Sequence, residues 1–405
     1  MTRALSGIRV IDMTSTVMGP SATQMLGDHG ADVIKVESSA GDTTRQVPPH
    51  KSPDMGVAYL QLNRNKRSVV LNLKRDADLD AMRALLKTAD IFIYSVRPAA
   101  MARLGLSPQE VESLNPQLIT VSLVGFGEGG PYAGRPVYED LIQGLTAVPS
   151  LLMQAGSPQP QYVPVAFNDR AVGLYTVAAI LTALFHRLRT GEAQHIELPM
   201  FESMAQFVLG DHMGGRSFEP PLGPPGYART LTPERRPYPT ADGYVCAIIY
   251  TDNHWRAFGK LVGKPNLVDE DERFATLRSR TIYAHDTYSF VQEIMPSRTT
   301  AEWLKLLVEA DIPATPLHTL DTIFDDPHLN ATGFFQRTEH PTEGTLLSIR
   351  GPANWSKTPP AMITPAPRLG EHTRQVLSEL GYSPADVAKI AGSCDEPTSI
   401  EHGGR

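Results

Sequence analysis

Residues 163–203 read VPVAFNDRAVGLYTVAAILTALFHRLRTGEAQHIELPMFES, and the middle of this stretch has the pattern of one long helix. Apolar residues occupy more than one face between Ala171 and Leu188, which predicts that most of the helix is buried. Arg187 and Arg189 fall in its last turn, and Gly191 follows as a stop signal. Asp169 lies at the opposite end, in the cap or the first turn.

Asp169 has two physical interpretations at this position. A carboxylate there faces the positive end of the helix dipole and unpaired backbone N–H groups, which should keep it ionised. An ionised carboxylate suits a nucleophile. Aspartate is also a common helix cap without any chemical role. Position alone leaves both interpretations open.

The overall composition is that of an ordinary globular enzyme. The chain has 405 residues, of which 41% are hydrophobic and 20% charged, and it is long enough for two or three domains. The net charge of −7 argues against a general nucleic-acid or membrane binder, so a phosphate-bearing ligand needs a local cationic patch. The two cysteines show no CxxC spacing, which favours the cytoplasm. We expect no signal peptide and no membrane span.

The first half of the chain alternates short apolar strands with helices. Strands are predicted at residues 8–12, 31–37, 68–73, 90–95, 118–123 and 195–198. A helix beginning near Gly19-Pro20 separates the first two, and an amphipathic helix at 76–88 follows the third. This β-α-β order favours an α/β fold with a mainly parallel sheet and right-handed crossovers.

Glu37, at the end of the second predicted strand, resembles the acidic residue of a dinucleotide site. The turn before it argues against that function. TSTVMGP contains one glycine where the dinucleotide fingerprint needs G-x-G-x-x-G. Nicotinamide binding is therefore not expected.

Two proline-rich stretches divide the chain. Prolines cluster between residues 217 and 239 and again between 352 and 367, which indicates extended segments. They bracket a central region, so the first domain should be discontinuous. We predict a large domain of residues 1–205 with 340–405, a linker at 206–239, and a small α+β domain at 240–339.

Several motifs carry a resemblance to one family. Asn168-Asp169-Arg170, Gly173 and the following LTALFHRLRTGEAQHIELPMFES look like the signature of the family III CoA-transferases, the CaiB/BaiF superfamily that includes formyl-CoA transferase. VMGPSATQMLGDHGADVIKVES and SVRPAAMARLGL resemble further family segments in family order. The resemblance spans Leu5 to about Tyr382. It implies a Rossmann-like large domain, a smaller α+β domain and an interlocked homodimer.

The resemblance also implies residue roles. Asp169 would be the nucleophile that carries the acyl group while CoA passes from an acyl-CoA donor to a carboxylate acceptor. The residues implied to line the CoA and acyl site are Val17, Met18, Leu71, Lys74, Arg97, Arg103, Leu104, Val137, Tyr138 and Glu139. Arg103 suits a CoA phosphate, because a guanidinium can bind two phosphate oxygens at once. Only carboxylates and one thiol are exchanged, so no metal or bound cofactor is needed.

Some positions depart from better-known members. Val17 stands where some members carry a glutamine, which removes a polar contact to an oxalate-like or formyl-like group. Small dicarboxylate or branched acyl groups are the substrate classes considered. Glycines between Gly125 and Gly130 suggest a close-lying loop, whose N–H groups could stabilise an oxyanion.

Two alternatives to acyl transfer are considered. Related racemases, such as α-methylacyl-CoA racemase, have a histidine about where this chain has Tyr138. Racemisation needs an acid and a base on opposite faces, and a tyrosine with its ordinary pKa of about 10 is a weak base at neutral pH. The missing histidine therefore favours transfer. The second alternative is a CoA-binding protein without turnover, against which the complete motif around Asp169 argues.

Overall fold

The computed structural model describes residues 3–392, which form two compact units. Unit 1 contains residues 3–142, 165–204 and 328–392. Unit 2 contains residues 143–164 and 205–327. The chain therefore leaves unit 1 twice and returns to it twice.

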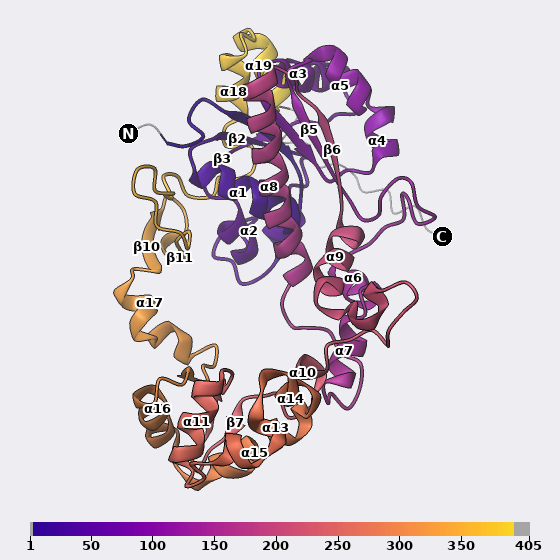
Figure 1. The fold of residues 1–405 in the computed structure, drawn as a ribbon. Coiled ribbons are helices and arrows are strands. Elements are labelled where there is room, and N and C mark those ends of the chain that lie inside the picture. The colour runs from indigo at the N-terminus through magenta and orange to yellow at the C-terminus, as the bar shows by residue number, and fades with distance from the viewer. Residues whose placement is uncertain (1–2, 393–405) are drawn as a thin grey trace. The chain divides into compact units, whose positions relative to one another are not determined.

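Unit 1 is built on a six-stranded, fully parallel sheet (Figure 1). Its spatial order is β3-β2-β1-β4-β5-β6. The strands are β1 Arg9–Met13, β2 Asp32–Glu37, β3 Lys66–Val70, β4 Ile91–Tyr94, β5 Ile119–Val124 and β6 His195–Pro199. The order reverses between β1 and β4, where a doubly wound sheet binds its ligands. The α/β prediction is confirmed, although β3 begins and ends earlier than the expected 68–73.

Strands β1 to β5 are almost entirely buried because helices cover both faces of the sheet. One face carries α3 Asp76–Lys87, α4 Pro98–Arg103, α5 Pro108–Leu114, α18 Thr373–Glu379 and α19 Pro384–Gly392. The other face carries α1 Met18–Asp28 and α8 Phe167–Thr190 (Figure 1). Leu26 of α1 and Ile180 of α8 are among the fully or almost fully buried residues there.

A glycine sets the distance between α1 and α8. A Cβ atom on Gly173 would lie 2.4 Å from Ser21 Oγ and 3.1 Å from the Met18 carbonyl oxygen. Ser21 Oγ itself donates a 2.8 Å hydrogen bond to that carbonyl. The start of α8, which carries Asp169, is therefore packed closely on the first turn of α1.

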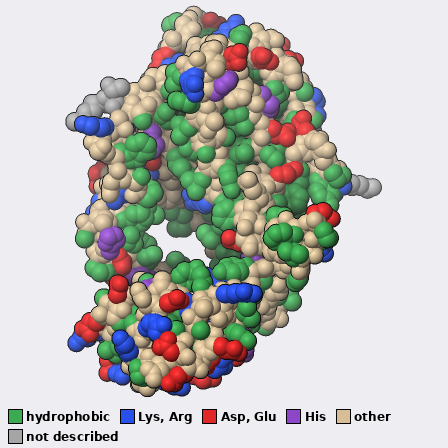
Figure 2. Space-filling model, in the orientation of Figure 1, with side chains coloured by type: hydrophobic (Ala, Val, Ile, Leu, Met, Phe, Trp, Pro, Cys, Tyr) green, Lys and Arg blue, Asp and Glu red, His purple; other side chains and the backbone are tan. Residues whose placement is uncertain are grey.

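The expectation that most of α8 is buried is wrong for the single chain. Val172, Ile180 and Ala183 are fully buried, but Phe185 is 60% and Leu188 80% exposed. Figure 2 shows hydrophobic side chains on the surface over this helix. A sheet can cover only one side of a helix that lies on it, so the second apolar side stays uncovered.

By length and composition alone, α8 is also the one helix within residues 3–392 that could cross a membrane. Its buried side is part of the hydrophobic core above β1, β4 and β5. That packing is typical of a helix in an α/β domain.

Unit 2 combines a small sheet with many short helices. Its antiparallel strands are β7 Tyr238–Pro239, β8 Tyr244–Ala247 and β9 Ala314–Pro316. Its larger helices are α7 Val148–Gln154, α11 Asp252–Leu261, α15 Ala284–Ile294 and α16 Thr300–Glu309. Trp255, Phe258, Phe274 and Trp303 form the centre of its core. Asp242-Gly243 lies in the turn between β7 and β8.

The predicted domain boundaries differ from the two units at three places. Residues 206–212 were expected in the linker but belong to helix α9 Met200–His212, which contains no proline. Residues 143–164 lie in unit 2 rather than in the large domain. Residues 328–339 lie in unit 1, because β10 Phe335–His340 pairs with β11 Gly344–Ile349.

Candidate active site

Asp169 is the third residue of α8, but it does not cap that helix. The backbone N–H of Asp169 donates to Glu139 Oε2 at 3.0 Å, and that of Asn168 donates to Glu139 Oε1 at 3.3 Å. Glu139 begins helix α6 Glu139–Leu145. The capping carboxylate is thus supplied by a distant residue, which leaves the Asp169 side chain available for chemistry.

The pKa of Asp169 is raised to about 6. Burial is the main cause and the negative charge of Glu139 the second, while Arg170 acts in the opposite direction. The expected lowering by the helix dipole is therefore overcome. With a pKa near 6, about nine-tenths of the carboxyl groups are still ionised at pH 7. A strongly shifted carboxylate in a cavity is typical of a functional site.

Asp169 lines a cavity of about 620 Å³. The walls come from the turns that follow β1, β4 and β5 and from the starts of α1, α4, α6 and α9. Among the lining residues are Ser15, Thr16, Met18, Arg97, Phe126, Glu128, Arg135, Val137, Tyr138, Glu139 and Met200. The cavity therefore lies at the carboxyl ends of the strands where the sheet order reverses, as expected for a ligand site.

A second cavity, of about 780 Å³, adjoins the first. Ser15, Thr43 and Ser95 line both cavities, so one elongated ligand can occupy the two. The second cavity continues along the ends of β2 and β3 and beside α4, where it is lined by Leu71, Lys74, Arg103 and Leu104.

The structure brings together nearly all the residues singled out from the sequence. Leu71, Lys74, Arg103 and Leu104 line the second cavity, and Met18, Arg97, Val137, Tyr138 and Glu139 line the first with Asp169. Val17 precedes α1 and does not line either cavity. Arg135 and Glu128 are lining residues that were not predicted from the sequence. Glu128 lies within the glycine-rich loop between Gly125 and Gly130, and Arg135 follows that loop by five residues.

An acidic chain needs a local group of cations to bind a phosphate-bearing ligand, and four cationic side chains line the two cavities. They are Lys74, Arg97, Arg103 and Arg135. Within residues 3–392 none of them forms a salt bridge, and Arg135 stacks on the Tyr132 ring at 4.7 Å. Unpaired guanidinium and ammonium groups along a cavity suit phosphates and carboxylates.

The glycine-rich loop is largely hydrogen-bonded within the protein. Gly127 N–H donates to Glu202 Oε1 at 3.0 Å, and Glu128 N–H donates to Glu197 Oε1 at 3.1 Å. Gly130 N–H donates to the Gly127 carbonyl. The suggestion that these three N–H groups stabilise an oxyanion is therefore wrong, because each already has an acceptor.

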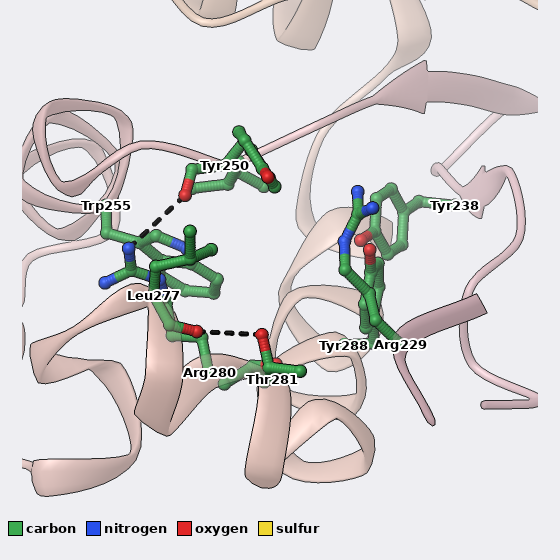
Figure 3. A pocket seen from close by; sticks show the side chains of 10 residues that line it. Arg229, Tyr238, Tyr250, Trp255, Leu277, Arg280, Thr281 and Tyr288 are labelled. Atoms are coloured by element: carbon green, nitrogen blue, oxygen red, sulfur yellow. Dashed lines mark hydrogen bonds between the residues drawn. The ribbon is translucent and has the colours of Figure 1, made fainter. Parts of the chain in front are cut away.

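Unit 2 contains a separate, much smaller pocket (Figure 3). Arg229, Tyr238, Tyr250, Trp255 and Tyr288 are among its lining residues, and its volume is about 30 Å³. Arg280 donates to the Tyr250 carbonyl there and pairs with Asp252. The space is about that of one water molecule, so it does not compete with the unit 1 cavities as a substrate site.

The chain belongs to CoA-transferase family III, whose family model matches residues 5–373. It is therefore an enzyme of the CoA-transferase class, and CoA thioesters are the substrates of this class. The succinate–glutarate CoA-transferase of Agrobacterium fabrum is 36% identical over 93% of this chain and 95% of that relative. The formyl-CoA:oxalate CoA-transferase of Escherichia coli is 31% identical over 96% of this chain and 99% of that relative.

Solved structures agree with this membership. Rv3272 of Mycobacterium tuberculosis, solved as a point mutant, superposes with a TM-score of 0.80 at 31% identity, over 93% of this chain and 99% of that one. A CaiB/BaiF family protein of Brucella suis gives a TM-score of 0.78 at 30% identity, over 94% of this chain and 100% of that one. The relatives' names favour CoA transfer and give no support to the racemase alternative.

Proposed function

We propose that this enzyme moves CoA from an acyl-CoA donor to a carboxylate acceptor through covalent intermediates on Asp169. The observation that carries the proposal is the placement of Asp169. Its carboxylate lines a cavity at the switch point of the sheet, its backbone is held by Glu139, and it is mainly ionised at pH 7. A partly buried carboxylate with these properties suits covalent catalysis.

The two cavities together suit an extended CoA thioester. Lys74 and Arg103 in the second cavity would bind the phosphates at the nucleotide end. The pantetheine arm would pass Ser15, Thr43 and Ser95, which the cavities share. The thioester would then reach Asp169 in the first cavity.

The chemistry uses only carboxylates and one thiol. An Asp169 oxygen attacks the thioester carbonyl, the C–S bond breaks, and a mixed anhydride and a CoA thiolate form. The thiolate attacks the aspartyl carbonyl, which releases the donor acid and leaves an aspartyl-CoA thioester. An acceptor carboxylate then attacks this thioester and forms a second mixed anhydride with release of the thiolate. Attack of the thiolate on the acceptor's carbonyl gives the new acyl-CoA and regenerates Asp169.

The raised pKa of Asp169 is useful in this scheme. A more basic carboxylate is a better nucleophile, provided that it remains ionised at the working pH. A pKa of about 6 meets both conditions near neutral pH. The partial burial that raises the pKa also limits access of water, which would hydrolyse the anhydride.

Small dicarboxylic acids are the substrates that we propose. The Agrobacterium fabrum relative is named for succinate and glutarate, and a human relative at 28% identity is named for succinyl-CoA and glutarate. In this chain Arg135 lines the Asp169 cavity without an ion pair among the described residues. Its guanidinium would bind the second carboxylate of such a substrate.

A homodimer in the cytoplasm is the proposed form of the enzyme. The apolar side of α8 that includes Leu181, Phe185 and Leu188 is exposed in the single chain. Surfaces of this kind commonly mark protein–protein interfaces. We propose that a second copy covers this side in an interlocked dimer of the type that the family resemblance implies.

Peptide mass spectrometry after incubation with a panel of acyl-CoAs and trapping with hydroxylamine would test the proposal. We expect a hydroxamate on Asp169 with at least one donor and none in Asp169→Asn. An unmodified Asp169 with every donor, in protein that binds CoA by calorimetry, would reject covalent transfer. Deuterium uptake at the α-carbon in heavy water would then support the racemase alternative.

A further inference from the structure

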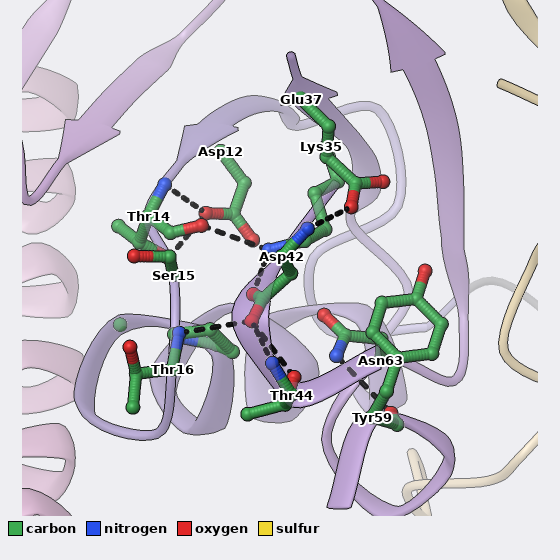
Figure 4. Close-up of polar contacts among 12 residues, drawn as sticks. Asp12, Thr14, Ser15, Thr16, Lys35, Glu37, Asp42, Thr44, Tyr59 and Asn63 are labelled. Carbon is green, nitrogen blue, oxygen red and sulfur yellow. Dashed lines mark hydrogen bonds and ion pairs between the residues drawn. The ribbon is translucent and has the colours of Figure 1, made fainter. Parts of the chain in front are cut away.

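Six ionisable side chains form a buried cluster next to the turns that line the two cavities, and Figure 4 labels four of them, Asp12, Lys35, Glu37 and Asp42. They are Asp12, Lys35, Glu37, Asp42, Arg45 and Lys66, and none is more than 6% exposed. Three are acidic and three are basic. Buried charges require close pairing and further hydrogen bonds to be tolerated, so the contacts of this cluster indicate what it holds in place.

Lys66, on β3, contacts the end of β1, the first turn of α1 and the segment just before β3. Its Nζ lies 3.1 Å from Asp12 Oδ2, 3.0 Å from the Pro20 carbonyl and 2.9 Å from Asn63 Oδ1. Asp12 also accepts a 2.6 Å hydrogen bond from Thr23 and holds the hydroxyl and N–H groups of Thr14. The end of β1 is thereby fastened to β3 and to the first turn of α1.

Lys35 and Asp42 hold the turn that follows β1. Lys35 Nζ donates to the Thr14 carbonyl at 2.8 Å and pairs with Asp42 Oδ2 at 2.9 Å. Asp42 Oδ1 accepts the N–H groups of Thr16 at 3.2 Å and of Thr44 at 2.9 Å. Thr16 has a φ of +72°, which is unfavourable for a β-branched residue. The turn keeps this conformation because several buried contacts determine it together.

Glu37 and Arg45 hold the loop after β2. Arg45 Nε and one of its terminal nitrogens each lie 2.8 Å from a different Glu37 oxygen, so the pair is bidentate. Glu37 Oε1 also accepts the Asp42 N–H at 3.0 Å. Asp42 therefore joins the Glu37–Arg45 pair to Lys35.

The segments held by the cluster are those that face the substrate cavities. Ser15 and Thr43 line both cavities, and Thr16 and Met18 line the Asp169 cavity. Met18 contacts the helix of Asp169, since its carbonyl is within 3.1 Å of the Cβ position of Gly173. Asp12, Lys35, Arg45 and Lys66 line neither cavity. These four can affect a ligand only through the segments that they hold.

We infer that the buried cluster is a positioning device for acyl-CoA, in which Asp12, Lys35 and Lys66 fix Ser15–Met18 and Thr43 so that the bound thioester is aligned with Asp169. This inference rests on the proposed function. Removing one charge of a buried pair leaves its partner uncompensated, so the held turns should shift even when the domain stays folded. A small displacement from the attack geometry costs a large part of the rate.

The buried state of the cluster depends on mutual compensation. Burial lowers the pKa of Lys66 to about 8, although Asp12 acts to raise it. Burial alone would lower the pKa of Lys35 as well, but Asp12, Asp42 and Glu37 raise it overall. Loss of the Asp12 carboxylate would therefore lower the pKa of both lysines.

Three variants and one matched control test the inference. Lys66→Met removes one charge, and Asp12→Asn with Lys66→Met removes a balanced pair. Thr23→Val removes the short hydroxyl bond to Asp12 and the longer contacts of the same hydroxyl with the Gly19 and Pro20 carbonyls. It changes no charge, so it tests the cluster even if Lys66→Met fails to fold. The control is Arg64→Met, because Arg64 forms another buried ion pair in unit 1, with Asp28 at 2.7 Å, and lines neither substrate cavity.

The rate at which Asp169 is acylated in a single turnover and the affinity for CoA are the readouts, with melting temperature as the folding control. We expect Lys66→Met to slow acylation about tenfold or more, because alignment is lost. Thr23→Val should slow it about threefold, and the double variant should recover part of the loss, because coupled buried partners are non-additive. Arg64→Met should lower the melting temperature but leave acylation within about twofold of the wild type.

Acylation within about twofold of the wild type in all folded cluster variants would overturn the inference, as would an equal loss in Arg64→Met. A wild type that binds CoA but never acylates Asp169 would instead reject the proposed function. In that case the CoA affinities of the variants alone test the inference about the cluster. It should fall about fivefold in Lys66→Met and not in Arg64→Met, and equal affinities would overturn it.

Discussion

The backbone N–H of Asp169 donates a 3.0 Å hydrogen bond to the carboxylate of Glu139. This contact joins the first turn of α8 to the first residue of α6, although the two residues are 30 positions apart in the sequence. It places a second negative charge beside the proposed nucleophile, so Glu139 both holds the backbone and raises the pKa of Asp169.

Glu139→Gln should lower the pH at which Asp169 acylation falls off on the acidic side of its pH profile. Asp169 acts in its ionised form, so acylation in the wild type should fall as the pH drops through about 6. The amide oxygen can still accept one of the two backbone N–H groups that Glu139 holds, and the substitution removes the charge that contributes to the raised pKa. The pH dependence of Asp169 acylation would check this, with Glu128→Gln as a control from the same cavity. An unchanged pH profile would show that Glu139 does not set this pKa.

Asp169→Asn should abolish acylation and also stabilise the folded protein at neutral pH. The folded-state pKa of Asp169 is raised above its ordinary value of 3.8, so its contribution to stability is lost as the pH rises through about 6. Removing the charge should therefore raise the free energy of unfolding by up to about 3 kcal/mol at pH 8, less solvent screening. Urea denaturation at pH 8 and pH 5 would measure it. An equal effect at both pH values would contradict the electrostatic explanation.

Arg135→Gln should discriminate between acyl groups that differ only in a terminal carboxylate. We expect the KM for succinyl-CoA to rise about tenfold, because a charged hydrogen-bond partner is lost. The KM for butyryl-CoA, which has the same chain length without that carboxylate, should change little. Steady-state kinetics on both donors would compare the effects. Equal changes for the two donors would show that Arg135 does not recognise the acyl group.

Gly173→Ala should destabilise unit 1 through the contact between α8 and α1. A Cβ atom at this position would lie 2.4 Å from Ser21 Oγ, so the helices must separate or Ser21 must move. We expect a loss of about 1–3 kcal/mol in the free energy of unfolding. Gly210→Ala on α9 is the matched control, because nothing lies within 4 Å of its Cβ position. It should be neutral or stabilising by about 0.5–1 kcal/mol, as alanine is the better helix former.

Phe185→Glu with Leu188→Glu should prevent assembly of the dimer, so that the variant is produced as a monomer. Both side chains are at least 60% exposed on the uncovered side of α8, so their replacement leaves the core of the single chain intact. Light scattering after size-exclusion chromatography would give the molecular mass of wild type and variant. A wild-type monomer, or a variant that remains a dimer, would show that this side of α8 is not the interface.

The sequence by itself determined the features that depend on neighbouring residues. Alternating apolar strands and helices predicted the parallel sheet, because strand and helix periods are local properties. The capping box between Ser107 and Glu110 at the start of α5 is such a local feature, since its two residues are three positions apart. Asp169 was singled out by its place at the start of an apolar helix and by the family motif around it.

Only the tertiary structure decided the features that depend on residues far apart in the chain. Glu139 caps the Asp169 helix. Burial, and secondly the charge of Glu139, raise the pKa of Asp169, which is opposite to the change expected from the helix dipole. In the sequence, Lys66, Lys35 and Asp12 are charged residues of three separate strands, and no local pattern shows that they are buried together. They meet because β3, β2 and β1 are adjacent in the sheet, where burial makes each charge depend on the others.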